Sequence, residues 1–91
     1  MLRIDIPQNT EPAFNYAAFE QYNIPLPANG TDTEVNGDVI LLFEDEQEAV
    51  EYLDTLEDYA TGLDNNAVQK PMVNALVSSI SNDEFVQAYL R

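Results

Sequence analysis

The chain contains no cysteine and no histidine. Without cysteine it can form no disulfide, thiolate nucleophile or sulfur-ligated metal site. Without histidine it lacks the side chain that most often transfers protons near neutral pH. Basic residues are also scarce, since Arg3, Lys70 and Arg91 are the only three among 91 residues, too few to build a phosphate or oxyanion clamp. We therefore expect a protein that is not an enzyme and holds no cofactor and no metal.

Acidic residues dominate the charge. Seventeen Asp and Glu give a formal net charge of −14, which favours solubility and opposes compaction by self-repulsion. Such a surface argues against direct binding to nucleic acid or to an anionic membrane, because both need basic side chains. A partner that meets this surface is expected to be a basic protein.

The apolar content is nevertheless that of a folded protein. Hydrophobic residues make up 45% of the chain, which is too high for a disordered acidic tail. The length predicts a single domain over residues 1–91. No apolar run approaches the ~20 residues of a membrane span, and residues 1–6 lack the apolar core of a signal peptide. We expect a soluble, cytoplasmic protein.

Two consecutive segments, residues 39–43 and residues 45–61, are the stretch around which the rest of the chain is expected to fold. Residues 39–43 are a continuous apolar run, typical of a strand covered on both faces. From Asp45 the pattern changes to helical period, with Asp45 as the cap and Glu48 as its reciprocal partner. Gly62 follows at a position suited to a left-handed cap. The apolar stripe of this helix comprises Ala49, Leu53, Leu56, Ala60 and Leu63.

Before this unit the sequence predicts two strands and a helix. Residues 2–6 alternate as a strand with one polar face. A helix is expected from Glu11 and Pro12, capped by Thr10. Residues 23–30 contain two prolines and form an extended connector. Residues 31–35 and 38–43 would pair as a hairpin through a type I′ turn at Asn36-Gly37.

After it, two more helices are expected. One begins near Lys70, with Pro71 in its first turn. The last covers residues 82–90, started by a capping box of Ser81 and Glu84 and by a hydrophobic staple between Ile80 and Phe85.

The fold class is therefore α+β, in the order β-α-β-β-α-α-α. A small, mainly antiparallel sheet of three strands packs helices on one face, with residues 39–43 central and next to residues 2–6. The expected core comprises Leu2, Ile4, Ile6, Phe14, Ala18, Val39, Leu41, Phe43, Ala49, Leu53, Leu56, Val73, Leu76, Val77, Ile80 and Phe85.

A calcium-binding loop is one alternative for the hairpin. Asp32, Glu34, Asn36 and Gly37 fall at positions one, three, five and six of an EF-hand pattern. The twelfth position, which requires a bidentate Glu, is Phe43. A polar hairpin turn explains the same residues without a metal.

The functional hypothesis follows from the placement of the acids. Eight of them lie between residues 44 and 58, and about one per helical turn would share a stripe. We predict a non-enzymatic binding protein that contacts a basic protein through this helix, and in its sharper form an inhibitor that mimics nucleic acid in the groove of a nucleic-acid-binding protein. The expected contact residues are Glu44, Glu48, Glu51, Asp54, Glu57, Asp58, Asp32 and Glu34.

The alternative is a structural or regulatory interaction module whose acidic face only solubilises it. Such a module would use exposed aromatic anchors and could be a homodimer paired through its last helix. The candidate anchors are Tyr16, Phe19, Tyr22, Tyr52 and Tyr59. Exposure of Tyr52 and Tyr59 beside the acids would indicate a binding face, and their burial a solvated back.

Overall fold

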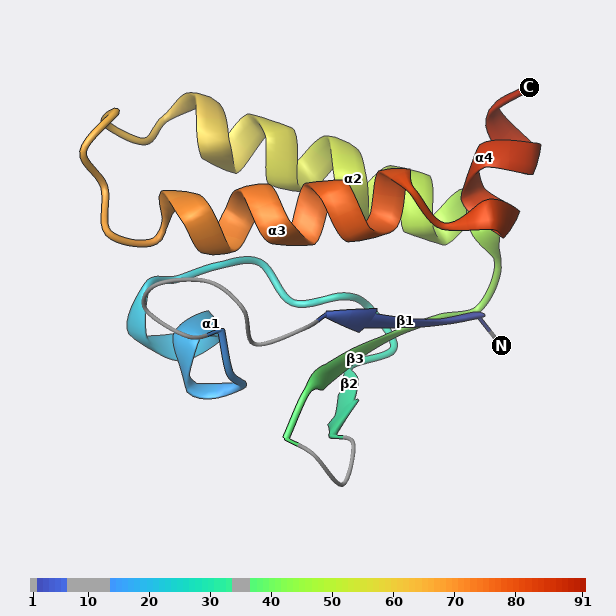
Figure 1. The fold of residues 1–91 in the computed structure, drawn as a ribbon, viewed down its shortest axis with the longest axis horizontal. Coiled ribbons are helices and arrows are strands. Elements are labelled where there is room, and N and C mark those ends of the chain that lie inside the picture. Colours follow the sequence, from blue (N-terminus) through green and yellow to red (C-terminus); the bar gives the residue numbers. More distant parts are fainter. Residues whose placement is uncertain (1, 7–13, 34–36) are drawn as a thin grey trace.

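The structure is a computed structural model that describes residues 2–6, 14–33 and 37–91. It confirms the α+β class and the order of elements (Figure 1). The elements are β1 (Leu2–Ile6), α1 (Ala17–Gln21), β2 (Thr31–Thr33), β3 (Val39–Phe43), α2 (Glu46–Thr61), α3 (Lys70–Ser81) and α4 (Glu84–Leu90).

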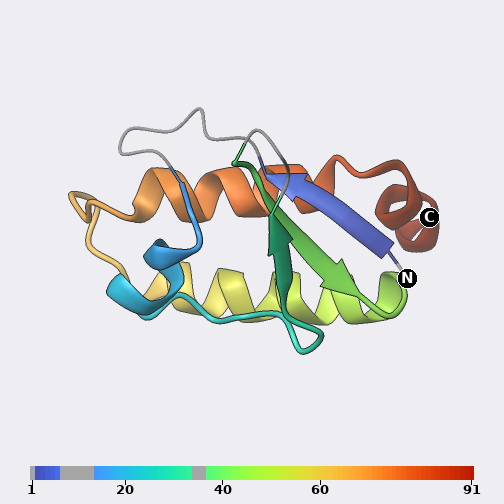
Figure 2. The ribbon, with the colours of Figure 1, turned by 90° about the horizontal axis from the view of Figure 1, so that it is seen from below.

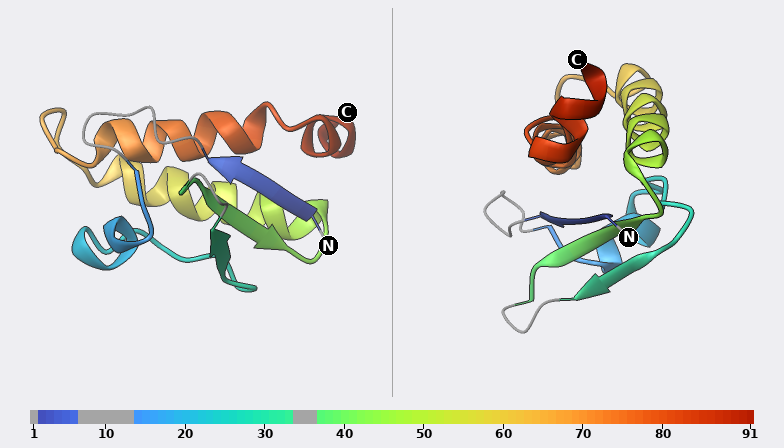
Figure 3. Two further views of the ribbon diagram at one scale, coloured as in Figure 1. Left: turned by 60° about the horizontal axis from the view of Figure 1, so that its bottom comes forward. Right: turned by 90° about the vertical axis from the view of Figure 1, so that its right-hand side faces the viewer.

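The three strands form one antiparallel sheet in the order β1-β3-β2, so β3 is central as predicted. Helices α2 and α3 lie side by side across one face of it, and α1 lies beyond one end of the sheet (Figures 2 and 3). Val39, Leu41 and Phe43 of β3 are buried in the core under these helices. The strand therefore ends at the point where α2 begins.

Most of the expected core is confirmed. Thirteen of the sixteen residues are buried: Ile4, Ile6, Phe14, Ala18, Val39, Leu41, Phe43, Ala49, Leu53, Leu56, Val73, Leu76 and Ile80. Leu2 and Val77 are half-buried and pack against these residues. The prediction for Phe85 is wrong, because its side chain is 54% exposed. The prediction missed the buried residues Phe19, Ile24, Ile40, Tyr52, Met72 and Val86.

The other face of the sheet is covered in part by its own side chains. Ile40 points away from the helices and lies between Asp5 and Asp32 of the neighbouring strands, yet it is only 3% exposed. Arg3 reaches across β3 and forms an ion pair with Asp32, with 3.2 Å between nitrogen and oxygen. Two hydrogen-bond donors, first the Thr33 N–H and then the Arg3 guanidinium, lower the pKa of the Asp32 carboxyl.

The register of the hairpin differs from the prediction. Thr33 lies opposite Val39, which leaves an odd number of residues between them. A two-residue turn at Asn36-Gly37 with regular pairing on both sides would leave an even number, so the predicted register is wrong, while the turn itself falls partly on residues outside those described. Gly37 has a φ of 92°, in the left-handed region that glycine adopts in hairpin turns. Asn36 itself lies outside the described residues.

Helix α1 is shorter than expected, because Phe14 and Asn15 are not helical and the helix begins at Ala17. The predicted cap, Thr10, lies outside the described residues. Phe14 is fully buried and meets the ring of Phe19 edge-on, with 5.3 Å between centroids. Packing of these two rings, rather than helical period, decides which side chains of this segment are buried.

The long helix α2 begins as predicted, because the Asp45 carboxylate accepts a hydrogen bond of 3.0 Å from the Glu48 N–H. Its end differs from the prediction. Gly62 has a φ of −82°, in the right-handed region, and its N–H donates to carbonyls of the last turn. A left-handed glycine cap is therefore absent at this position, and α2 ends without one.

Helix α3 begins at Lys70 with Pro71 in its first turn, as predicted. Ser81, the residue expected to cap the last helix, is instead the last residue of α3, and the cap of α4 is Asp83, two residues later. The Asp83 carboxylate accepts from the N–H groups of Phe85 and Val86. Moving the cap by two residues removes the predicted capping box and staple, because Val86 then faces the core and Phe85 faces outward.

Candidate acidic interface

Four exposed carboxylates define what we call the acidic row of α2: Glu51, Asp54, Glu57 and Asp58. At about 100° of rotation per residue they occupy roughly 120° of the helix circumference. The buried side of the same helix fixes this orientation, because Ala49, Leu53 and Leu56 are tied into the core. Rotation of α2 that hid the row would expose these apolar side chains.

No basic side chain neutralises the row. Arg3 pairs with Asp32 on the far face of the sheet, and the Lys70 ammonium donates to the Asn65 side chain. Within the described part of the chain, none of the four carboxylates has a lysine or arginine partner. Gln47 donates a hydrogen bond of 3.3 Å to Glu51, which is a neutral contact. Among the described residues, the row therefore has no cation paired with it.

Glu48 differs from the other predicted acids of α2. It is half-buried, and its carboxylate accepts hydrogen bonds from the Asn29 side chain and from the Glu44 N–H. The reciprocal partner expected for it, the Asp45 N–H, is replaced by Glu44 one residue earlier. Glu48 thus fastens residues 26–30 to the start of α2, and it does not belong to the acidic row. Glu44 is exposed, but precedes the helix.

Asp32, the predicted contact residue of the hairpin that the structure describes, does not extend the row. Asp32 shares the face of the sheet with Ile40, while α2 covers the opposite face. Its carboxylate is also engaged by Arg3. Glu34 lies outside the described residues. Of the eight predicted contact residues, the structure thus brings four together, and Glu44 lies before the first residue of the helix.

Two tyrosines of α2 attach the proline-rich connector to the helix. The Tyr52 hydroxyl donates a hydrogen bond of 2.6 Å to the Pro25 carbonyl, and the Tyr59 hydroxyl donates to the Tyr22 carbonyl. Tyr52 is buried against Phe43, with 5.5 Å between ring centroids. Both rings pack inward, and by the criterion set out above their burial favours a solvated back, so a binding role for α2 rests on its carboxylates alone.

Burial also determines which of the other candidate aromatic anchors could contact a partner. Phe19 is 3% exposed and Tyr22 is half-buried against the core, so neither offers a free ring. Tyr16 alone among the five candidates is exposed. Helical spacing does not encode this difference, because the burial of Tyr52 and Tyr59 depends on their contacts with β3 and the connector.

Replacing Tyr52 with phenylalanine is expected to lower the free energy of unfolding by about 1 kcal/mol at pH 8, because the Pro25 carbonyl loses its donor. Burial raises the pKa of the Tyr52 phenol, so the folded protein holds this proton more tightly than the unfolded chain does. The stability that the protonated Tyr52 hydroxyl contributes is present below a pH of about 10 and is lost as the pH rises further.

The difference between wild type and Tyr52→Phe should therefore shrink above pH 10, which urea unfolding at pH 8 and at higher pH would measure. Tyr16→Phe, at an exposed ring, is the control and should change stability little at either pH. A difference between wild type and Tyr52→Phe that is constant with pH would contradict the assignment.

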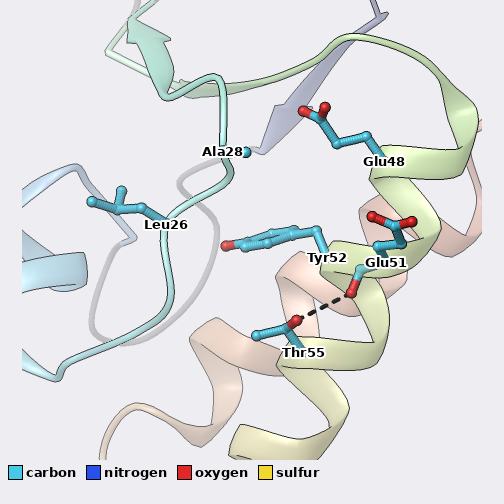
Figure 4. Close-up of a pocket in the computed structure, with 6 residues that line it drawn as sticks. All are labelled: Leu26, Ala28, Glu48, Glu51, Tyr52 and Thr55. Atoms are coloured by element: carbon cyan, nitrogen blue, oxygen red, sulfur yellow. Dashed lines mark hydrogen bonds between the residues drawn. The ribbon is translucent and has the colours of Figure 1, made fainter.

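A shallow groove runs beside the acidic row, between α2 and the connector (Figure 4). Its volume is about 240 Å³. The Tyr52 ring lies across it toward the connector, and the Glu48 and Glu51 side chains stand on its α2 side. The remaining lining residues are Leu26, Ala28 and Thr55. An apolar floor beside carboxylates suits the stem and head of a lysine or arginine side chain.

Other kinds of site find little support in the described ranges. There, no three acidic side chains come together as a group that could hold a metal ion. Within the same residues, no helix combines the length and apolarity needed to cross a bilayer. Comparison with known protein families, with curated proteins and with solved structures found no match to this chain.

Proposed function

We propose that this protein is a non-enzymatic binding protein whose acidic row docks against a basic protein surface. One observation carries the proposal: four exposed carboxylates lie on one side of a helix packed against the core, and within the described residues no lysine or arginine pairs with any of them. A surface of this kind attracts a positively charged partner and steers its approach. Helix α2 presents the row without a rearrangement of its backbone, because its buried side and its Asp45 cap fix it in place.

The charge density of the row resembles that of a nucleic-acid strand. Glu51 and Asp58 are seven residues apart, which is about 10.5 Å along a helix. Four charges over that length give about one per 3.5 Å, against one phosphate per ~3.4 Å along a single DNA strand. This similarity supports the sharper form of the proposal, an inhibitor that occupies the nucleic-acid groove of its partner.

The position of Glu57 and Asp58 adds support. Both lie near the C-terminal end of α2, where the helix dipole disfavours negative charge, and the last turn holds no basic residue. Each such acid costs a few tenths of a kcal/mol. Residues that lower stability in a locally consistent fold are often kept for function.

The test is affinity capture from an extract of the source organism at low and at high salt. A captured basic protein should be released at about 0.5 M salt, where exposed charges more than ~5 Å apart are largely screened. It should also be displaced by duplex DNA if the row occupies a nucleic-acid groove. Capture that resists salt and ignores DNA would contradict docking through the row.

A further inference from the structure

Helix α4 exposes an apolar surface that the core does not use. Of its seven residues only Val86 is buried, while Phe85, Tyr89 and Leu90 are 54%, 50% and 57% exposed. Phe85 and Tyr89 are four residues apart and so share one side of the helix. Phe85 and Tyr89 thus form a small exposed apolar patch, while Leu90 lies about 140° from Phe85 around the helix.

The patch continues into a hollow formed by three elements. Phe85 of α4, Leu2 of β1 and the residues at and just before the start of α2 line an open depression of about 250 Å³. The start of β1, the start of α2 and α4 lie at the same end of the molecule in both views (Figures 1 and 2). The size fits one large apolar side chain. The hollow therefore offers a place for an anchor residue of a partner.

The charge of the residues that line the hollow indicates which kind of partner segment could bind there. The other residues lining the hollow are Glu44, Asp45 and Glu46, and none of the described lysine and arginine residues lines it. Arg91 follows α4 at the end marked C in Figure 1 and is not among the lining residues. A second copy of this chain, paired by a two-fold axis, would bring the same three acids against these. Lysine or arginine next to an apolar anchor would instead match the rim.

We propose that the hollow between α4, β1 and α2 receives an apolar anchor side chain, flanked by lysine or arginine, from the basic partner. This rests on the proposed function and assigns a second contact to the same partner. Glu46 on the rim and Glu57 in the acidic row are eleven residues apart, and so lie on the same side of α2 about 16 Å from each other. One partner segment of that length would reach both.

Two synthetic peptides test the assignment. Both are 15-residue amidated helical peptides of lysine and alanine, and one carries a single tryptophan at its centre in place of alanine. Fluorescence polarisation of dye-labelled peptide gives each Kd at low salt. We expect the tryptophan peptide to bind about tenfold more tightly, because its indole ring is transferred from water into the hollow.

Variants of the protein locate the effect. Phe85→Ala should abolish the preference for tryptophan, and Tyr89→Ala should reduce it, while both leave the affinity for the alanine peptide within about twofold. Val68→Ala is the matched control, because Val68 is 56% exposed in the loop between α2 and α3, at the other end of these helices. It should keep the full preference.

The outcomes separate the two proposals. Equal binding of both peptides, or a preference that survives Phe85→Ala, overturns the hollow as an anchor site and leaves the acidic row intact. Binding of neither peptide contradicts both. Sedimentation that shows a dimer of the wild type and a monomer of Phe85→Ala would mean that a second copy covers the patch, which also overturns the assignment.

Discussion

Replacing Leu56 with alanine is expected to lower the free energy of unfolding by about 2–5 kcal/mol. Leu56 is fully buried where α2 packs on the core. A domain of this length is stabilised by only about 5–14 kcal/mol, and its self-repulsion at −14 works against it. The substitution should therefore consume much of the available stability, measured as a lower midpoint in urea.

The control is Val68→Ala, at an exposed apolar position. It should change the free energy of unfolding by less than about 0.5 kcal/mol. A loss at Leu56 that is no larger than at Val68 would mean that α2 is not fixed against the core. The acidic row would then lack a defined direction.

Reversing charge at Asp54 and Asp58 to lysine is expected to weaken binding of the lysine–alanine peptide about 10- to 100-fold at low salt. Each reversed site loses an attraction of up to ~1 kcal/mol and adds a repulsion of similar size. Stability should not fall, because a lysine near the C-terminal end of α2 suits the helix dipole. A binding defect in a protein that is at least as stable cannot come from unfolding.

The matched control reverses Glu20 and Asp64, two exposed acids outside α2, to lysine. It changes the net charge by the same amount, so it measures the part of the effect that is independent of position. We expect a loss of binding several-fold smaller than for the α2 pair. Equal losses would show that overall charge, and not the row, attracts the peptide.

The central unit of the fold was predictable because local signals agree there. The apolar run at residues 39–43, the Asp45 cap and the apolar period of α2 all favour the same strand and helix, which the structure confirms. Pro71 likewise located the start of α3. Where several local preferences coincide, tertiary packing has little left to decide.

Other features depend on contacts between distant residues. Asp83 replaced the capping box expected at Ser81, and this shift by two residues turned Phe85 outward. Tyr52 was expected among the candidate anchors, yet the Pro25 carbonyl and the Phe43 ring hold it inside. No periodicity in the sequence reports such partners.

The positions of the candidate contact residues were predicted only in part, because some of them also depend on contacts between distant residues. The period of α2 correctly placed its outward acids, since it follows from the buried stripe of the same helix. Glu48 was expected among them, but Asn29, nineteen residues away, engages its carboxylate. Asp32 lies on the far face of the sheet because the hairpin register assigns it there.

The central claim is that a basic partner contacts the protein along α2 and not over its acidic surface in general. Titration of the 15N-labelled protein with the lysine–alanine peptide, followed by backbone amide shifts in two-dimensional NMR, tests it directly. We predict that the largest shifts fall between residues 46 and 58. Shifts of equal size at Glu20, Asp32 and Asp64 would contradict it.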